Sequence, residues 1–145
     1  MAILFTTLLS VFALATEPAG PQYKKTEIQI KNTKLTVELA QTEEQTSHGL
    51  MFRQKLAEND GMLFIFPTTE VRTFWMKNTF VPLSIGFFDD KMQLIDIQDM
   101  KPVKSEMETD LPLYKSAGPA RYALEVPQGW FTKKKIKVGD YLKMK

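Results

Sequence analysis

Short apolar runs that alternate with polar residues recur along this chain, and they constrain its fold more than any other feature. Ile28 and Ile30 form one such run, and Leu35, Val37 and Leu39 form the next. Because successive side chains of a strand point to opposite faces, a spacing of two predicts half-buried strands. The alternation returns at 83–87 and at 122–126, with turn residues between the runs. The chain is therefore predicted to be mainly β, a single antiparallel β-sandwich or jelly-roll-like domain with one or two short helices.

Other segments refine this interpretation. The continuous apolar run at 62–66 stops at Pro67 and predicts a strand that is covered on both faces, followed by another strand at 71–76. The alternation shifts by one residue at Leu94-Ile95, which predicts a β-bulge. The long polar stretch at 100–118 is expected to be a loop.

A helix is expected where a capping box occurs. In Thr42-Glu43-Glu44-Gln45, a hydroxyl stands at the N-cap and a glutamine follows three residues later. We expect a short helix from Glu43 to about Met51, with its acidic first turn favoured by the helix dipole.

The start of the chain resembles a secretory signal peptide. Residues 3–14 form an uncharged apolar run that is too short to span a bilayer comfortably, and Ala13 and Ala15 have the A-x-A spacing that signal peptidase recognises. The absence of Lys and Arg from this segment weakens the match, and a buried N-terminal strand or an uncleaved anchor stays open as the alternative. We expect a periplasmic or secreted protein with no membrane span after cleavage, divided into a signal peptide at 1–15, a flexible lead-in at 16–25 and a β domain at 26–145.

Composition excludes several kinds of site. The chain of 145 residues has no cysteine and a single histidine, His48, so disulfides, thiolate chemistry and multi-histidine metal centres are excluded. The acids Glu106, Glu108 and Asp110 alternate in the long loop but lack the calcium-loop pattern. A formal net charge of +2 gives no argument for nucleic-acid binding. We expect no metal, no cofactor, no nucleic-acid partner and a monomeric protein.

Four ordered blocks resemble the signature of one family. They are Gly49-Leu-Met-Phe-Arg53, Gly61-Met-Leu-Phe-Ile-Phe66, Phe74-Trp-Met-Lys-Asn-Thr79 with Pro82-Leu83, and Gly118-Pro-Ala-Arg-Tyr-Ala-Leu-Glu125. Together they are similar to the DUF192 (UPF0127) family over about residues 28–143. The resemblance implies a small jelly-roll-type β-sandwich, often exported, with no established activity. The chain departs from the family pattern at Ser84, at His48 and in its cysteine-free loop, so no role that the family assigns at those places is carried over.

The sharpest polar cluster is Trp75-Met76-Lys77-Asn78-Thr79. On a strand, Trp75, Lys77 and Thr79 share one face, which places an aromatic plate beside a cation and a hydroxyl. Indole faces stack on sugar rings, and Lys, Asn and Thr side chains hydrogen-bond to hydroxyls or carboxylates. The alternative is a core tryptophan followed by a turn that Asn78 caps.

Arg53, Arg121 and Glu125 complete the candidate ligand-binding set. Arg121 and Glu125 share a strand face but lie about 13 Å apart along it, so each needs another partner or a ligand. An arginine on a partly buried face can bind a carboxylate in bidentate fashion, and the alternative is a structural ion pair. We expect Trp75, Lys77 and Arg121 to converge on one concave site.

Binding is the favoured function because the sequence offers few routes to catalysis. The expected ligand is an unidentified small molecule, for which analogy at the level of the fold suggests a glycan or a cell-envelope fragment. Two alternatives stay open. One is an envelope hydrolase or lyase that uses Arg53, His48 and an acid, and the other is a protein-interaction module of an envelope assembly.

Overall fold

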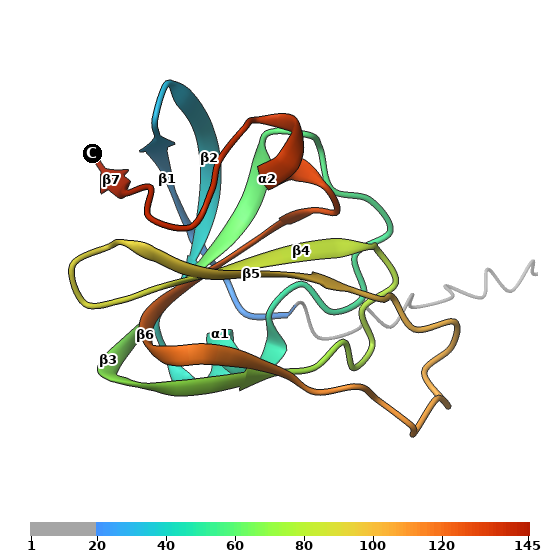
Figure 1. Ribbon diagram of the computed structural model, residues 1–145. Coiled ribbons are helices and arrows are strands. Elements are labelled where there is room, and N and C mark those ends of the chain that lie inside the picture. The colour runs from blue at the N-terminus through green and yellow to red at the C-terminus, as the bar shows by residue number, and fades with distance from the viewer. Residues whose placement is uncertain (1–19) are drawn as a thin grey trace, which may run out of the picture.

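The computed structural model describes residues 20–145, so the predicted signal peptide and part of the predicted lead-in lie outside the described residues. The described chain forms seven strands and two short helices (Figure 1). In chain order these are β1 (Lys24–Ile30), β2 (Thr33–Ala40), α1 (Glu43–His48), β3 (Asp60–Phe74), β4 (Leu83–Phe88), β5 (Leu94–Met100), β6 (Tyr114–Pro127), α2 (Trp130–Lys133) and β7 (Leu142–Met144).

The strands form one curled, mixed sheet in the order β5-β4-β6-β3-β2-β1-β7. The mainly-β prediction with two short helices is confirmed, but one neighbouring pair differs from a purely antiparallel sheet. β2 and β3 run parallel, with Val37 opposite Gly61. A parallel pair needs a crossover connection, and the segment between these strands supplies it by carrying α1.

The two edges of the sheet approach each other at one end. Gln93, just before β5, forms an antiparallel bridge with Tyr141, just before β7. The Leu94 backbone N–H donates to Asp140 O at 2.8 Å, and the Leu142 N–H donates to Met92 O at 2.9 Å. These bonds satisfy backbone groups that an open edge would expose, so the curled sheet is partly closed into a barrel.

Each face of the sheet has its own apolar core. On the α2 side, Leu124 and Val126 of β6 pack with Trp130 and Phe131 of α2. On the α1 side, a second cluster contains Met62 and Phe64 of β3, Ile85 and Phe87 of β4, and Leu50 just after α1. Figure 1 shows the two helices on opposite sides of the sheet. All six residues of β4 are buried because both faces of this strand are covered.

The local turn and capping signals are largely confirmed. Thr42 accepts a hydrogen bond from Gln45 N, and the full capping box is present. The helix ends at His48, earlier than predicted, because Gly49 adopts φ 53° at the C-cap. The predicted β-bulge is also present: Phe87 pairs with Asp96 and Phe88 with Leu94, which leaves Ile95 as the extra residue.

Pro67 does not end a strand as predicted. β3 continues through it to Phe74, but the register with β6 jumps from Ile65 to Glu70. Pro67 therefore lies where no ladder hydrogen bond is needed, the position in a sheet that tolerates proline. The two predicted strands are one bent strand, and its second half forms a wall of the candidate site.

Candidate functional site

An open groove lies between α1 and the second half of β3, and we call it the Trp75 groove. It has a volume of about 480 Å³ and is lined by Thr46, Ser47, Phe66, Val71, Arg72, Thr73, Phe74 and Trp75. The Trp75 side chain is 48% exposed. The Lys77 ammonium lies 5.3 Å from the centre of the Trp75 ring, and the Arg72 guanidinium lies 4.1 Å from that of Phe66. The groove thus presents aromatic surface beside cations.

A narrow pocket adjoins this groove, and we call it the Glu125 pocket. The two share Thr46, Ser47, Phe74 and Trp75 as lining residues, and the pocket adds His48, Thr79 and Glu125, among others. Its volume is about 30 Å³, enough for one small polar group or one to two waters. The pocket therefore leads from the groove to the side of the sheet where Glu125 is buried.

Glu125 is a buried acid on the α1 side of β6. Its side chain is on the same face as Ala123 and is 5% exposed, with Met62 and Ile85 as its register partners on β3 and β4. Within residues 20–145, no hydrogen bond to its carboxyl is found, and burial raises the pKa of Glu125 to about 8. At neutral pH the group is a neutral acid, which both donates and accepts hydrogen bonds.

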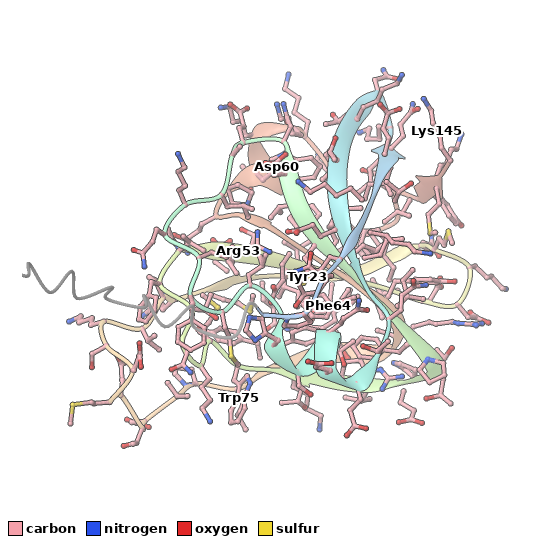
Figure 2. All side chains as sticks on the ribbon, turned by 180° about the vertical axis from the view of Figure 1, so that it is seen from behind. Tyr23, Arg53, Asp60, Phe64, Trp75 and Lys145 are labelled. Atoms are coloured by element: carbon pink, nitrogen blue, oxygen red, sulfur yellow. The ribbon has the colours of Figure 1, made fainter. Side chains whose placement is uncertain are left out.

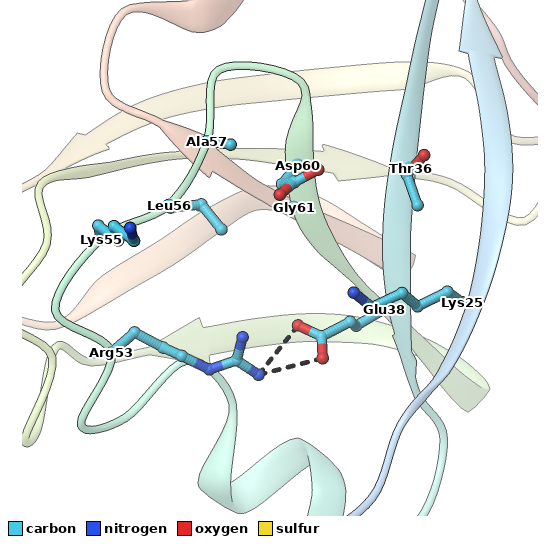
Figure 3. A pocket seen from close by; sticks show the side chains of 9 residues that line it. All are labelled: Lys25, Thr36, Glu38, Arg53, Lys55, Leu56, Ala57, Asp60 and Gly61. Atoms are coloured by element: carbon cyan, nitrogen blue, oxygen red, sulfur yellow. Dashed lines mark hydrogen bonds and ion pairs between the residues drawn. The ribbon is translucent and has the colours of Figure 1, made fainter.

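A second pocket, which we call the Arg53 pocket, lies beside β2 and the start of β3 (Figure 3). Its volume is about 300 Å³, and it is lined by Lys25, Thr36, Glu38, Arg53, Lys55, Leu56, Ala57, Asp60 and Gly61. Arg53 Nη2 lies 2.9 Å from Glu38 Oε2 and donates a hydrogen bond to Oε1 at 3.1 Å. The structural ion pair considered from the sequence is thus present, and it leaves the rest of the guanidinium beside the pocket.

The register of the sheet shows how the Arg53 pocket and the Glu125 pocket lie relative to each other. Lys25 lies opposite Glu38, Glu38 opposite Met62, and Met62 opposite Glu125. Glu38 and Glu125 thus stand in one row on one face, with Met62 on the strand between them. Adjacent strands are about 4.8 Å apart, so the two backbones are about 10 Å apart.

Tyr23 ties the start of β1 to α1 close to both pockets (Figure 2). Its hydroxyl donates to Gln45 O at 3.3 Å and to Gly49 O at 3.2 Å. Burial raises the pKa of Tyr23 to about 12, while the positive charge of Arg53 opposes the shift. Tyr23 therefore stays a neutral donor that holds the helix end against the sheet.

The residues predicted from the sequence are divided between these features. Trp75, Thr79 and Glu125 line the Glu125 pocket, and Lys77 stacks over Trp75. The strand face predicted for Trp75, Lys77 and Thr79 is wrong, because β3 ends at Phe74 and residues 77–78 form a turn. Asn78 lies in this turn with φ 50°, and its carbonyl accepts a hydrogen bond from the Phe52 N–H at 2.8 Å. Arg53 lines the other pocket.

Arg121 lines none of these three pockets. It is half-buried, and its Nε is buried without a hydrogen-bond partner among the described residues. Trp75 and Lys77 are thus in contact, while Arg121 does not share the lining of their groove.

Sequence reasoning missed Glu38 and the aromatic lining of the groove. Glu38 lies between Val37 and Leu39 in the alternating pattern, which marks it only as a polar position of a half-buried strand. Its pairing with Arg53 depends on the turn after α1, and no local pattern reveals that contact. Phe74 directly precedes Trp75, and this neighbouring aromatic pair is the signal that could have indicated it.

Within residues 20–145, no group of three or more His, Asp or Glu side chains is arranged to hold a metal ion. Glu106, Glu108 and Asp110 are all exposed in the loop before β6. The helices of the described part are too short to cross a membrane.

The curled β-sheet with two covered faces and pockets on its α1 side defines a small β-rich domain. Comparison with known protein families identifies the family of this domain. The sequence profile of DUF192, described as "Uncharacterized ACR", matches residues 25–144. The chain belongs to the DUF192 family, as its four blocks indicated. Comparison with curated proteins yields no match.

Two solved structures are similar to this chain over most of their length. One is a protein of Sinorhizobium meliloti 1021 described as a "putative transcription regulator", with a TM-score of 0.76, 30% identity, and coverage of 87% of this chain and 98% of that one. The other is a protein of unknown function from Novosphingobium aromaticivorans DSM 12444, with a TM-score of 0.73, 29% identity, and coverage of 89% and 94%.

Proposed function

We propose that this protein is an exported small-ligand-binding domain whose ligand is a glycan or another hydroxylated fragment of the cell envelope. One observation carries the proposal: the exposed indole of Trp75 adjoins a narrow pocket that the buried Glu125 helps to line. The sugar ring lies against the indole, and one of its hydroxyls enters the pocket. Export and location rest on residues 1–15 of the sequence.

The chemistry of the two groups matches that of a sugar. The apolar C–H face of a sugar ring packs on an indole face, and sugar hydroxyls both donate and accept hydrogen bonds. A neutral carboxyl offers both a donor and an acceptor, whereas a carboxylate offers acceptors alone. The raised pKa of Glu125 therefore suits a hydroxyl at neutral pH. Lys77 adds a cation at the edge of the indole for an acidic substituent.

Binding is favoured over the hydrolase or lyase alternative by the positions of the residues that the enzyme would need. His48 lines the Glu125 pocket, while Arg53 lines the other pocket and is paired with Glu38. The three groups named for that chemistry therefore do not line one cleft.

Tryptophan fluorescence tests the proposal directly. Trp75 is half-exposed and Trp130 is buried, so a ring that covers Trp75 changes the emission of the exposed tryptophan. Titration with chitobiose and with N-acetylmuramyl dipeptide is expected to shift the emission of the native protein, and this shift is lost in Trp75→Phe. Tyr141→Ala, which removes an exposed aromatic outside the groove, is the matched control and is expected to bind normally.

Dependence on pH tests the role of Glu125. Affinity of the native protein is expected to fall as the pH rises above about 8, because the ionised carboxyl loses its donor. Glu125→Gln keeps a donor and an acceptor at every pH, so its affinity is expected to stay constant. If neither probe changes the emission or the melting temperature, the proposed function is wrong.

A further inference from the structure

The Arg53 pocket differs in chemistry from the Trp75 groove. Three of its lining residues are cations, Lys25, Arg53 and Lys55, and two are carboxylates, Glu38 and Asp60. Three positive and two negative charges leave one net positive charge on the lining. The volume of about 300 Å³ is at the lower end of the range for small-molecule sites. The pocket therefore suits a small ligand with one negative charge.

Arg53 is held in place for such a ligand. One of its terminal nitrogens, Nη2, contacts both oxygens of Glu38, whose side chain is 16% exposed. Figure 3 shows the other terminal nitrogen on the pocket side, above the ion pair. Among residues 20–145, no hydrogen bond from Nε or Nη1 of Arg53 is found. Because Glu38 holds Nη2, the guanidinium is kept at the edge of the pocket before a ligand arrives, which lowers the entropic cost of binding.

Two further lining residues, Thr36 and Asp60, have side chains suited to hydrogen bonds with the hydroxyl groups of a ligand. Thr36 offers a hydroxyl, and Asp60 offers a carboxylate that accepts hydrogen bonds from hydroxyl groups. The Asp60 carboxylate would repel a ligand with several negative charges. Leu56 supplies apolar surface from the loop before β3, across the pocket from Thr36 (Figure 3).

We propose that the Arg53 pocket is a second binding site, specific for a small hydroxylated monocarboxylate of the sugar-acid class. The ligand carboxylate receives hydrogen bonds from Arg53 and is neutralised by Lys25 and Lys55. Its hydroxyls bind Asp60 and Thr36. A charge-assisted hydrogen bond from Nη1 to the ligand carboxylate gives direction as well as charge.

This site is separate from the one in the proposed function. The two pockets share no lining residue, and Met62 lies between Glu38 and Glu125 in the row across the sheet. Binding at the Arg53 pocket therefore does not need Trp75. The two proposals can fail independently.

Calorimetric titration of the full-length protein tests the inference with four probes. Glucuronate carries both the charge and the hydroxyls, glucose carries the hydroxyls alone, and acetate and inorganic phosphate carry charge without a sugar ring. We expect glucuronate to bind at least about tenfold more tightly than the other three, because each of them lacks one set of partners.

Variants then place the binding. Lys25→Gln combined with Lys55→Gln removes two exposed cations without touching the core, and it is expected to weaken glucuronate binding about tenfold or more. Arg53→Lys keeps the charge but loses the fork of donors, and it is expected to weaken binding similarly. Lys91→Gln, an exposed lysine outside the pocket, is the matched control and is expected to bind glucuronate like the native protein.

Three results would overturn the inference. The first is that glucuronate does not bind. The second is that acetate or phosphate binds as tightly as glucuronate, which would reveal a site for anions in general. The third is that the lysine double variant, whose fold is checked by its melting temperature, binds as well as Lys91→Gln.

Discussion

Replacing Glu125 by glutamine is expected to remove a large pH dependence from the stability of this protein. Burial raises the pKa of Glu125 from 4.5 to about 8. The folded state thus keeps the Glu125 proton over a pH range in which the unfolded chain has released it. Below the unfolded pKa both states are protonated and the group has no effect. As the pH rises from there to about 8, ionisation favours the unfolded chain, so the free energy of unfolding falls.

The magnitude follows from the two pKa values. Each pH unit between them costs about 1.4 kcal/mol. With a folded pKa of about 8 and an ordinary value of 4.5, the penalty is roughly 3 kcal/mol at pH 7 and about 5 kcal/mol above the folded pKa. Domains are usually stable by about 5–15 kcal/mol, so the effect is a large fraction of the total. A glutamine does not ionise, and any difference that it makes in packing is the same at every pH.

Urea denaturation of the native protein and of Glu125→Gln, from about pH 4 to about pH 9 at constant ionic strength, measures this difference. The stability of the variant relative to the native protein is expected to rise by roughly 3 kcal/mol between pH 4.5 and pH 7. Glu106→Gln, which removes an exposed glutamate, is the control whose pH dependence is subtracted. Parallel stability curves for the native protein and Glu125→Gln across this range would refute a buried neutral carboxyl.

Three further predictions concern stability. Gly86→Ala places a Cβ 2.6 Å from Phe131 Cζ, so it is expected to lower the free energy of unfolding by about 1–3 kcal/mol in urea. Thr42→Ala removes the hydroxyl that accepts from Gln45 N at 3.2 Å, and a loss of about 1 kcal/mol is expected by the same assay, with Thr42→Ser as the control. Glu58 pairs with two lysines that lower its pKa to about 2, so it stabilises the fold above its ordinary pKa of 4.5, and this contribution disappears as the pH falls towards 2. Melting curves of Glu58→Gln should therefore be less sensitive to acid than those of the native protein, and equal sensitivity would contradict the pairing.

Local features of the fold could be predicted because their causes are local. The capping box needs four residues that are close in sequence, and alternation at Leu35 and Val37 reports directly which side chains face the core. The bulge at Ile95 was visible as a shift in that alternation. In contrast, the path of β3 past Pro67 depends on the register of a strand about 50 residues further along the chain, so the sequence around Pro67 could not reveal it.

The candidate site divides in the same way. The sequence alone determined that Glu125 lies on a strand face with Ala123, whereas the strand face predicted for Trp75, Lys77 and Thr79 is a turn in the structure. Only the tertiary structure decided that Glu125 is buried beside the Trp75 groove and that Arg53 pairs with Glu38. The physical reason is that periodicity fixes which way a side chain points, while its surroundings depend on strand order. Here the parallel pairing of β2 with β3, which the crossover through α1 allows, aligns Glu38, Met62 and Glu125 in one row across the sheet. The neighbours that each residue meets in this row determine the burial of Glu125 and the charge around Glu38.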